Sequence, residues 1–207
     1  MDRMTYTMES FAYDVKAVVD AVNADKVILI GHSMGGHIIA RTARLMPKRV
    51  IGLIVVDTLQ DVEAFFPEEQ FKAILKSFQE DFKSHTEAFV RAEMIRPEDL
   101  DTMLTSWIVS DMAAEPKQVG ISALSEYLIQ FVTGEIPSVF KEVKVPFFGI
   151  NSDLVPTNVE INRKYIRHYD VTIMTEVGHF PMLEKAQKFN LIMKKAVNKI
   201  LFFKQSN

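Results

Sequence analysis

Short apolar runs flank an amphipathic segment near the start of the chain. Residues 26–30 and 50–56 are largely apolar and rich in β-branched side chains, a pattern typical of strands buried on both faces of a parallel sheet. Residues 34–46 between them have helical spacing and end at Pro47, which cannot continue a helix. A strand, a helix and a second strand in this order predict a right-handed parallel crossover.

Another helix is predicted ahead of the first strand. Thr7 is a suitable N-cap, because its side chain can accept a hydrogen bond from the first turn. Apolar residues then recur at helical spacing and predict a single buried stripe made of Phe11, Val15, Val18 and Val22.

The pattern between residues 60 and 140 differs from both ends of the chain. It is helical, without a convincing strand, and is interrupted by four prolines, three of which stand where a helix could begin: Pro67, Pro97, Pro116 and Pro137. A connection this long between two strands is too long for a simple loop. We therefore expect residues 60–140 to form a helical cap or lid, inserted into a core made of residues 1–59 and 141–207.

Sheet-like patterns return after this insertion. Strands are predicted over residues 145–151 and 171–175, a helix over 157–168, and a last amphipathic helix from about 184 to 201. Helices that alternate with buried strands predict an α/β fold, with a mostly parallel sheet flanked by helices.

The strongest candidate for chemistry is Gly31-x-Ser33-x-Gly35, which lies directly between a predicted strand and a predicted helix. A sharp turn at such a junction exposes the serine, and the flanking glycines let the backbone approach closely. The N-terminus of the following helix presents amide groups to a developing oxyanion, and the Met34 amide is the expected first donor. This placement favours a nucleophilic serine over a glycine turn with an incidental serine.

A serine nucleophile needs a base that takes its proton. His179 is the candidate, because it follows the last predicted strand and because histidine exchanges protons near neutral pH. The remaining histidines are less well placed for this role: His32, His37, His85 and His168.

An acid that orients the histidine is expected at the end of another strand. Asp153 follows the third predicted strand and is the preferred candidate, and Asp57 after the second strand is the alternative acid. For either aspartate, the plainer interpretation is a loop or turn former.

Composition narrows the classes of function. The 207 residues include no cysteine, which excludes disulfides, a thiolate nucleophile and cysteine-ligated metal sites. The net charge of −3 comes without a long block of one sign, so neither nucleic acid nor a membrane surface is an expected partner. No metal-binding or dinucleotide-binding motif occurs, and we expect no cofactor and no metal. The sequence has neither an apolar stretch long enough to cross a bilayer nor a signal-peptide pattern, so we expect a cytoplasmic protein.

These motifs resemble the α/β-hydrolase superfamily, in particular its esterases and lipases with a helical cap. The resemblance is carried by the helix after Thr7, by residues 30–36, by Asp153 in its loop and by residues 178–181, and it covers nearly the whole chain. A serine in place of an aspartate nucleophile argues against the dehalogenase and epoxide-hydrolase branches.

The resemblance implies roles for four groups in the chain order of that family. Ser33 would be the nucleophile, Asp153 the acid, His179 the base and the Met34 amide an oxyanion donor.

The resemblance also implies an N-terminally shortened fold. Family members normally carry further strands before the segment that begins here, with a loop that supplies a second oxyanion donor. The strand at residues 26–30 would then have a bare apolar edge, so we expect a homo-oligomer, or a partner, to form through it. Loss of one oxyanion donor costs about 10²–10³ in turnover, so weak hydrolysis is expected unless a second chain supplies a donor.

The sequence thus predicts a serine hydrolase that cleaves an ester or a related acyl bond of a small apolar substrate through an acyl-enzyme. Lactonase, C–C hydrolase, perhydrolase and acyltransferase activities stay open, because they use the same triad. The alternative from another class is a catalytically weakened or inactive hydrolase-like binding module, or a truncated gene product. Five residues are candidates for the substrate pocket: His32, Phe65, Phe66, Trp107 and Phe180.

Overall fold

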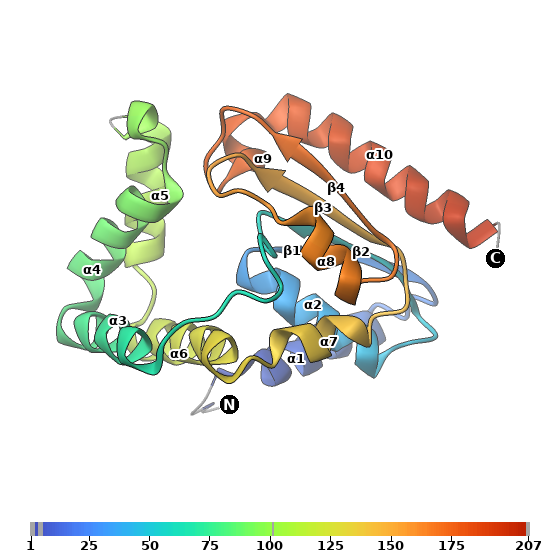
Figure 1. Ribbon diagram of the computed structural model, residues 1–207, viewed down its shortest axis with the longest axis horizontal. Coiled ribbons are helices and arrows are strands. Elements are labelled where there is room, and N and C mark those ends of the chain that lie inside the picture. The colour runs from blue at the N-terminus through green and yellow to red at the C-terminus, as the bar shows by residue number, and fades with distance from the viewer. Residues whose placement is uncertain (1–2, 4–5, 101, 206–207) are drawn as a thin grey trace.

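A four-stranded parallel sheet forms the centre of the molecule (Figure 1). The computed structural model describes residue 3, residues 6–100 and residues 102–205. The strands follow each other across the sheet in chain order: β1 (Val27–His32), β2 (Val50–Val56), β3 (Phe147–Ser152) and β4 (Tyr169–Met174). All four predicted strands are confirmed, with ends that differ by at most two residues.

Parallel pairing brings the carboxyl ends of the strands to one edge of the sheet. His32 pairs with Val56, Val56 pairs with Ile150, and Ser152 pairs with Met174. The segments that follow β1, β2, β3 and β4 therefore meet at this edge, as expected for the functional edge of a parallel α/β sheet.

Helices cover both faces of the sheet. Figure 1 shows α10 (Ala186–Gln205) on one side, and α1 (Met8–Ala21), α2 (Met34–Leu45) and α7 (Ile136–Lys141) on the other. On the α2 side, α8 (Val159–Tyr165) also packs against the apolar cluster. The α10 side holds a second apolar cluster, which includes Ile54 and Met174 from the strands.

The predicted helix at the N-terminus is confirmed, but its predicted buried stripe is wrong at two of its four residues, Val18 and Val22. Thr7 caps α1 by accepting a hydrogen bond from the Ser10 N–H at 2.9 Å. Val18 and Val22 are 62% and 66% exposed. Instead, α1 buries a face that includes Val19, because it packs mainly on α2 rather than on the strands.

The composition of β1 predicted burial on both faces, and this prediction is wrong. The strand is an edge strand of the sheet, and α10 packs mainly on β2 and β3. The Ile30 side chain is consequently 51% exposed, whereas Leu29 on the opposite face is buried.

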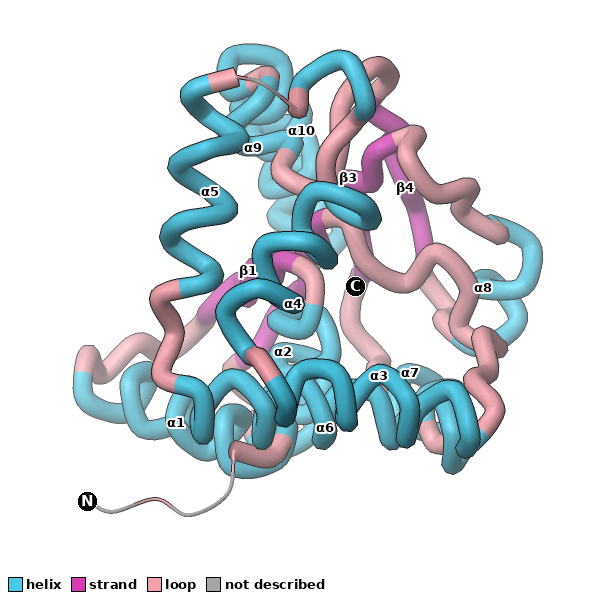
Figure 2. The backbone as a smooth tube through the Cα atoms, turned by 90° about the vertical axis from the view of Figure 1, so that its left-hand side faces the viewer, coloured by secondary structure: helices cyan, strands magenta, loops and turns pink. Residues whose placement is uncertain are grey.

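The described residues between β2 and β3 form helices joined by loops, and most of these helices lie to one side of the sheet (Figures 1 and 2). The elements are α3 (Glu68–Glu80), α4 (Phe82–Phe89), the π-helix η1 (Val90–Met94), the 3₁₀-helix η2 (Pro97–Asp99), α5 (Met103–Ala113), α6 (Lys117–Thr133) and α7. Pro67 and Pro116 directly precede α3 and α6, and Pro97 begins η2, so these prolines mark helix starts.

The predicted last helix is confirmed as α10, and a short helix, α9 (Pro181–Glu184), lies ahead of it. The two are separated at Lys185, whose backbone leaves the helical region at φ −133°. Among the described residues, none of the helices combines the length and apolar character needed to span a membrane.

Candidate active site

The turn between β1 and α2 holds Ser33 in a strained conformation. Its φ of 51° and ψ of −124° lie in a region that residues with a side chain seldom adopt. A Cβ at Gly31 would lie 2.3 Å from the Gly35 carbonyl oxygen, and one at Gly36 would lie 2.5 Å from Thr58 Cγ2. The turn is therefore tight enough to require glycine at both positions, whereas Gly35 has open space around its Cβ position.

Several residues at this edge of the sheet have strained backbone conformations. Besides Ser33, positive φ values occur at Asp57 and Leu59 after β2 and at Glu176 after β4. Such conformations cost about 1–3 kcal/mol each and cluster at functional sites. Three of the four strands therefore lead into strained turns at the same edge.

Met34 begins α2 directly after the serine. The first N–H groups of a helix have no acceptor within the helix, so the Met34 amide is available to a ligand beside Ser33. An N–H group at a helix N-terminus also carries the positive end of the helix dipole. The role of the Met34 N–H as an oxyanion donor stays a prediction.

His179 is paired with Asp57. The His179 Nδ1–H donates to Asp57 Oδ2 at 2.6 Å, and Asp57 is 3% exposed. The second carboxylate oxygen of Asp57 accepts the Ser152 N–H at 2.7 Å, which orients the carboxylate. This pair leaves Nε2 as the proton-accepting atom of the ring.

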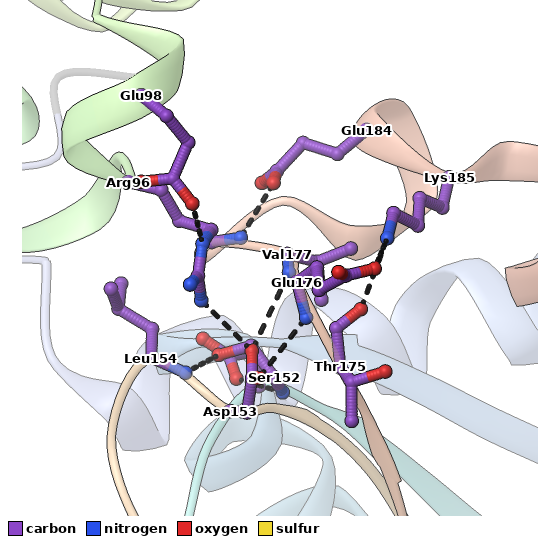
Figure 3. A network of polar contacts seen from close by, with 12 residues as sticks. Arg96, Glu98, Ser152, Asp153, Leu154, Thr175, Glu176, Val177, Glu184 and Lys185 are labelled. Carbon is purple, nitrogen blue, oxygen red and sulfur yellow. Dashed lines mark hydrogen bonds and ion pairs between the residues drawn. The ribbon is translucent and has the colours of Figure 1, made fainter.

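The structure pairs the His179 ring with the alternative acid, Asp57, whereas the preferred acid, Asp153, has different partners. Its Oδ2 accepts the Glu176 N–H at 3.0 Å and its Oδ1 accepts the Val177 N–H at 3.5 Å (Figure 3). Arg96 donates to Oδ1 at 3.0 Å. The Glu176 N–H, more than the Arg96 charge, holds the pKa of Asp153 below its usual value.

Asp153 therefore binds the backbone of the loop that carries His179, while Asp57 binds the ring itself. Both aspartates follow a strand that ends at the same edge, so their positions in the sequence cannot separate these two roles. The positive φ of Asp57, 44°, is the local feature that accompanies its contact with the ring.

His32 supports the same loop. Its Nε2–H donates to the His179 carbonyl oxygen at 2.7 Å, and the two rings lie 4.5 Å apart. Burial, and then the neighbouring His179, lower the pKa of His32 to about 4. The ring is therefore neutral at neutral pH and acts as a hydrogen-bond donor.

The aromatic pocket candidates fall into two groups. Phe180 is buried, and it packs with Val90 of η1 and Ile108 of α5. Phe65 and Trp107 are 63% and 56% exposed. Phe66 stacks on Phe131 at 5.2 Å. Phe180 thus has a packing role, while the exposed aromatic side chains stay candidates for contact with a substrate.

Sequence reasoning missed three groups that hold the His179 loop. The Met94 carbonyl oxygen, at the end of the π-helix, accepts the His179 N–H at 2.8 Å. Glu184 accepts two N–H groups of the loop, and Arg96 binds Asp153. An acidic residue shortly after the candidate base, in a helix that begins with proline, was the available signal for Glu184. Nothing local to Met94 or Arg96 indicates their contacts, which depend on how the helical segment docks.

The described residues include no group of three or more histidine or carboxylate side chains arranged to hold a metal ion.

Comparisons with known proteins agree with this fold. A family model described as "alpha/beta hydrolase fold" matches residues 1–101. A protein of Haemophilus influenzae named "Putative esterase/lipase" is 26% identical over 201 residues, which cover 96% of this chain and 69% of that protein.

Solved structures share the fold at low sequence identity. A thermophilic esterase from Thermogutta terrifontis has a TM-score of 0.75 at 17% identity, with 95% of this chain and 74% of the esterase covered. A bromoperoxidase from Bacillus anthracis has a TM-score of 0.78 at 16% identity, with coverage of 96% and 77%. An enzyme titled as degrading N-acyl homoserine lactones, Est816, has a TM-score of 0.73 at 20% identity, with coverage of 94% and 77%. The chain is thus similar to α/β hydrolases, in particular to proteins named as esterases or lipases.

Proposed function

We propose that the chain is a serine hydrolase that cleaves an ester or a related acyl bond of a small apolar substrate. The observation that carries this proposal is the pair of His179 Nδ1 and buried Asp57 at 2.6 Å, beside a serine held in a strained turn at the start of a helix. The names of the Haemophilus relative and of the solved esterases support an acyl substrate.

In the proposed mechanism, Ser33 Oγ attacks the substrate carbonyl while His179 Nε2 takes the hydroxyl proton. Asp57 keeps the proton on Nδ1 and stabilises the imidazolium that forms. The Met34 N–H donates to the oxyanion. His179 then returns the proton to the leaving alcohol as the acyl–oxygen bond breaks, and water releases the acyl group from Ser33 by the same route.

Among the described residues, the Ser33 hydroxyl and His179 are not hydrogen-bonded to each other, and the mechanism requires them to meet in the substrate complex. Catalytic hydrogen bonds are often long before substrate binds and tighten afterwards. The loop of His179 is held on both sides, so the required adjustment is a side-chain rotation rather than a loop movement.

The helices between β2 and β3 are proposed to act as the cap of this site. Two contacts from this segment support that role: the Met94 carbonyl oxygen binds the His179 N–H, and Arg96 binds Asp153. These contacts would hold the cap in a fixed position where it packs against the His179 loop. Its exposed aromatic side chains, Phe65 and Trp107, would contact the apolar part of a substrate.

The direct test is the Ser33→Ala variant, with p-nitrophenyl esters as substrates. We expect kcat to fall by about 10⁴-fold or more, because the nucleophile and its base act as a unit. Ser106→Ala is a matched control, since Ser106 is an exposed serine on α5, and it should keep wild-type kcat.

A fluorophosphonate probe provides a second measurement. Labelling of the wild-type chain but not of Ser33→Ala supports the proposal. Unchanged hydrolysis by Ser33→Ala would end it. If the folded wild-type chain is neither labelled nor active, the chain is a binding module with a hydrolase fold.

We also propose that two copies of the chain associate along β1. The strand pairs with β2 on one side only, and its Ile30 side chain is 51% exposed. Val18 and Val22 of α1 are exposed as well. An unprotected apolar edge strand offers free backbone groups to a second strand.

A further inference from the structure

We propose that Glu184 is a positioning residue that holds His179 in place through the backbone on both sides of it. The proposal rests on the proposed role of His179 as the base. Glu184 lies at the end of the four-residue helix α9, five residues after the histidine.

One carboxylate bridges the two residues that flank His179. Glu184 Oε2 accepts the Gly178 N–H at 2.5 Å, and Glu184 Oε1 accepts the Phe180 N–H at 2.9 Å. An ionised carboxylate has only acceptor sites, so it can satisfy both N–H groups at once. Such charge-assisted hydrogen bonds are shorter and stronger than neutral ones.

The remaining N–H groups of this loop are also bound. Glu176 and Val177 donate to Asp153, and His179 donates to the Met94 carbonyl oxygen. Five consecutive N–H groups, from residue 176 to residue 180, therefore have an acceptor. Figure 3 shows the carboxylates of Asp153 and Glu184 directed at this stretch of backbone.

The bridge also explains the glycine before the histidine. A Cβ at Gly178 would lie 2.6 Å from the Met94 carbonyl oxygen and 3.2 Å from Glu184 Oε1. The loop thus packs tightly between the helical segment and Glu184. Residue 178 must be glycine for the Met94 carbonyl oxygen and the Glu184 carboxylate to lie this close to its Cα.

The position of the His179 backbone affects the proposed catalysis directly. The His179 ring must keep its 2.6 Å contact with Asp57 and still present Nε2 to Ser33. A misplacement of about 1 Å in a catalytic group can cost about 10²-fold in rate. A carboxylate that fixes the backbone on both sides limits such shifts without touching the substrate.

The test uses Glu184→Gln in the full chain. Glutamine has the same shape but only one acceptor oxygen, so one of the two N–H groups faces a donor instead. Glu160→Gln is the matched control, because Glu160 is an exposed residue of α8 whose side chain pairs with Arg163. Each variant is assayed for kcat and KM on a p-nitrophenyl ester, and for the ¹H NMR signal of His179 Nδ1–H, assigned by its loss in His179→Gln.

We expect Glu184→Gln to lower kcat by about tenfold to 10²-fold, to change KM less than twofold, and to shift or broaden the Nδ1–H signal. Glu160→Gln should change none of these. Wild-type kcat together with an unchanged signal in Glu184→Gln would overturn the proposal, and so would a lower melting temperature with unaltered kcat. If Glu184→Gln does not fold, Glu184→Asp is tested in its place, because it keeps an acceptor-only side chain that is too short to bridge both N–H groups. A wild-type signal and kcat in Glu184→Asp then count against the proposal.

This experiment separates two kinds of failure. The Nδ1–H signal reports on the His179–Asp57 pair whether or not the chain hydrolyses esters. If Ser33→Ala keeps activity but Glu184→Gln alters the signal, the proposed function fails and the positioning role stands. If Ser33 proves essential and Glu184→Gln changes neither the signal nor kcat, only the positioning role fails.

Discussion

At the carboxyl edge of the sheet, different side chains bind different parts of His179 and its loop. Asp57 binds the ring, whereas Asp153 and Glu184 bind the backbone of its loop. All three are carboxylates, and the atom that each one accepts from decides its role. His32 completes the set by donating to the His179 carbonyl oxygen.

The first prediction separates the two aspartates. Asp57→Asn should lower kcat by about 10⁴-fold, because an amide that replaces the carboxylate favours the wrong imidazole tautomer. Asp153→Asn should cost far less, because it loosens the loop but leaves the Asp57 contact in place. Steady-state kinetics on one ester measures kcat for both variants. An equal decrease of kcat in the two would contradict these roles.

The second prediction concerns acid stability. Burial lowers the pKa of His37 to about 3 and that of His32 to about 4. Both values lie below the unfolded value of about 6.5, so the unfolded chain binds protons that the folded chain does not. Their contribution to stability is complete above pH 6.5 and is lost as the pH falls toward the folded pKa values.

Each of these histidines should lower the free energy of unfolding by up to about 1.4 kcal/mol per pH unit in that window. Urea denaturation between pH 7 and pH 4.5 measures the slope. His37→Leu should have a shallower slope than the wild type, whatever its stability at pH 7. An identical slope in the variant would show that His37 does not contribute.

At the scale of elements, the turn from β1 into α2 and the loop after β4 are both packed against neighbours. Thr58, after β2, packs on Gly36 at the start of α2. The loop after β4 docks on the helical segment, where Phe180 joins an apolar cluster with Val90 and Ile108. The site is thus built from elements that are far apart in sequence and that fit closely.

The third prediction uses two adjacent glycines of α2. Gly36→Ala should destabilise the fold by about 1–3 kcal/mol, because the added Cβ would lie 2.5 Å from the buried Thr58 side chain. Gly35→Ala is the matched control. Its Cβ has open space, and alanine favours a helix by roughly 0.5–1 kcal/mol over glycine. Chemical denaturation of both variants gives the order, and a more stable Gly36→Ala than Gly35→Ala would refute this packing.

At the scale of the whole molecule, helices cover both faces of the sheet, and β1 lies at one of its two edges. The β2 and β3 strands lie between helices, and the core clusters centre on them. The Ile30 side chain of β1 is 51% exposed, on the face of the strand opposite to the buried Leu29. Burial of such a surface against a second copy would remove apolar area from water.

The fourth prediction is a dimer at micromolar concentration, measured by size-exclusion chromatography with light scattering. Ile30→Lys should shift the chain toward monomer, because a lysine at the edge strand opposes pairing. Val155→Lys is the control, since Val155 is 48% exposed in the loop after β3. A monodisperse wild-type monomer would rule out this association.

Much of this arrangement is local in origin, and so the sequence determined it. Runs of apolar residues set four strands, Pro67, Pro97 and Pro116 mark helix starts, and Thr7 caps α1. The strand–Gly-x-Ser-x-Gly–helix junction and a histidine after the last strand indicated the site, because these patterns depend on neighbours along the chain.

Only the tertiary structure decided which carboxylate meets His179, which face of α1 is buried, and how the helical segment reaches the loop after β4. Each of these depends on the direction of a side chain or on the docking of two distant elements, and many docking geometries satisfy the same hydrophobic pattern. Asp57 and Asp153 both end strands at the same edge, and the difference between their roles arises from a turn of φ 44° and from the carbonyl and N–H groups that the folded chain brings to each.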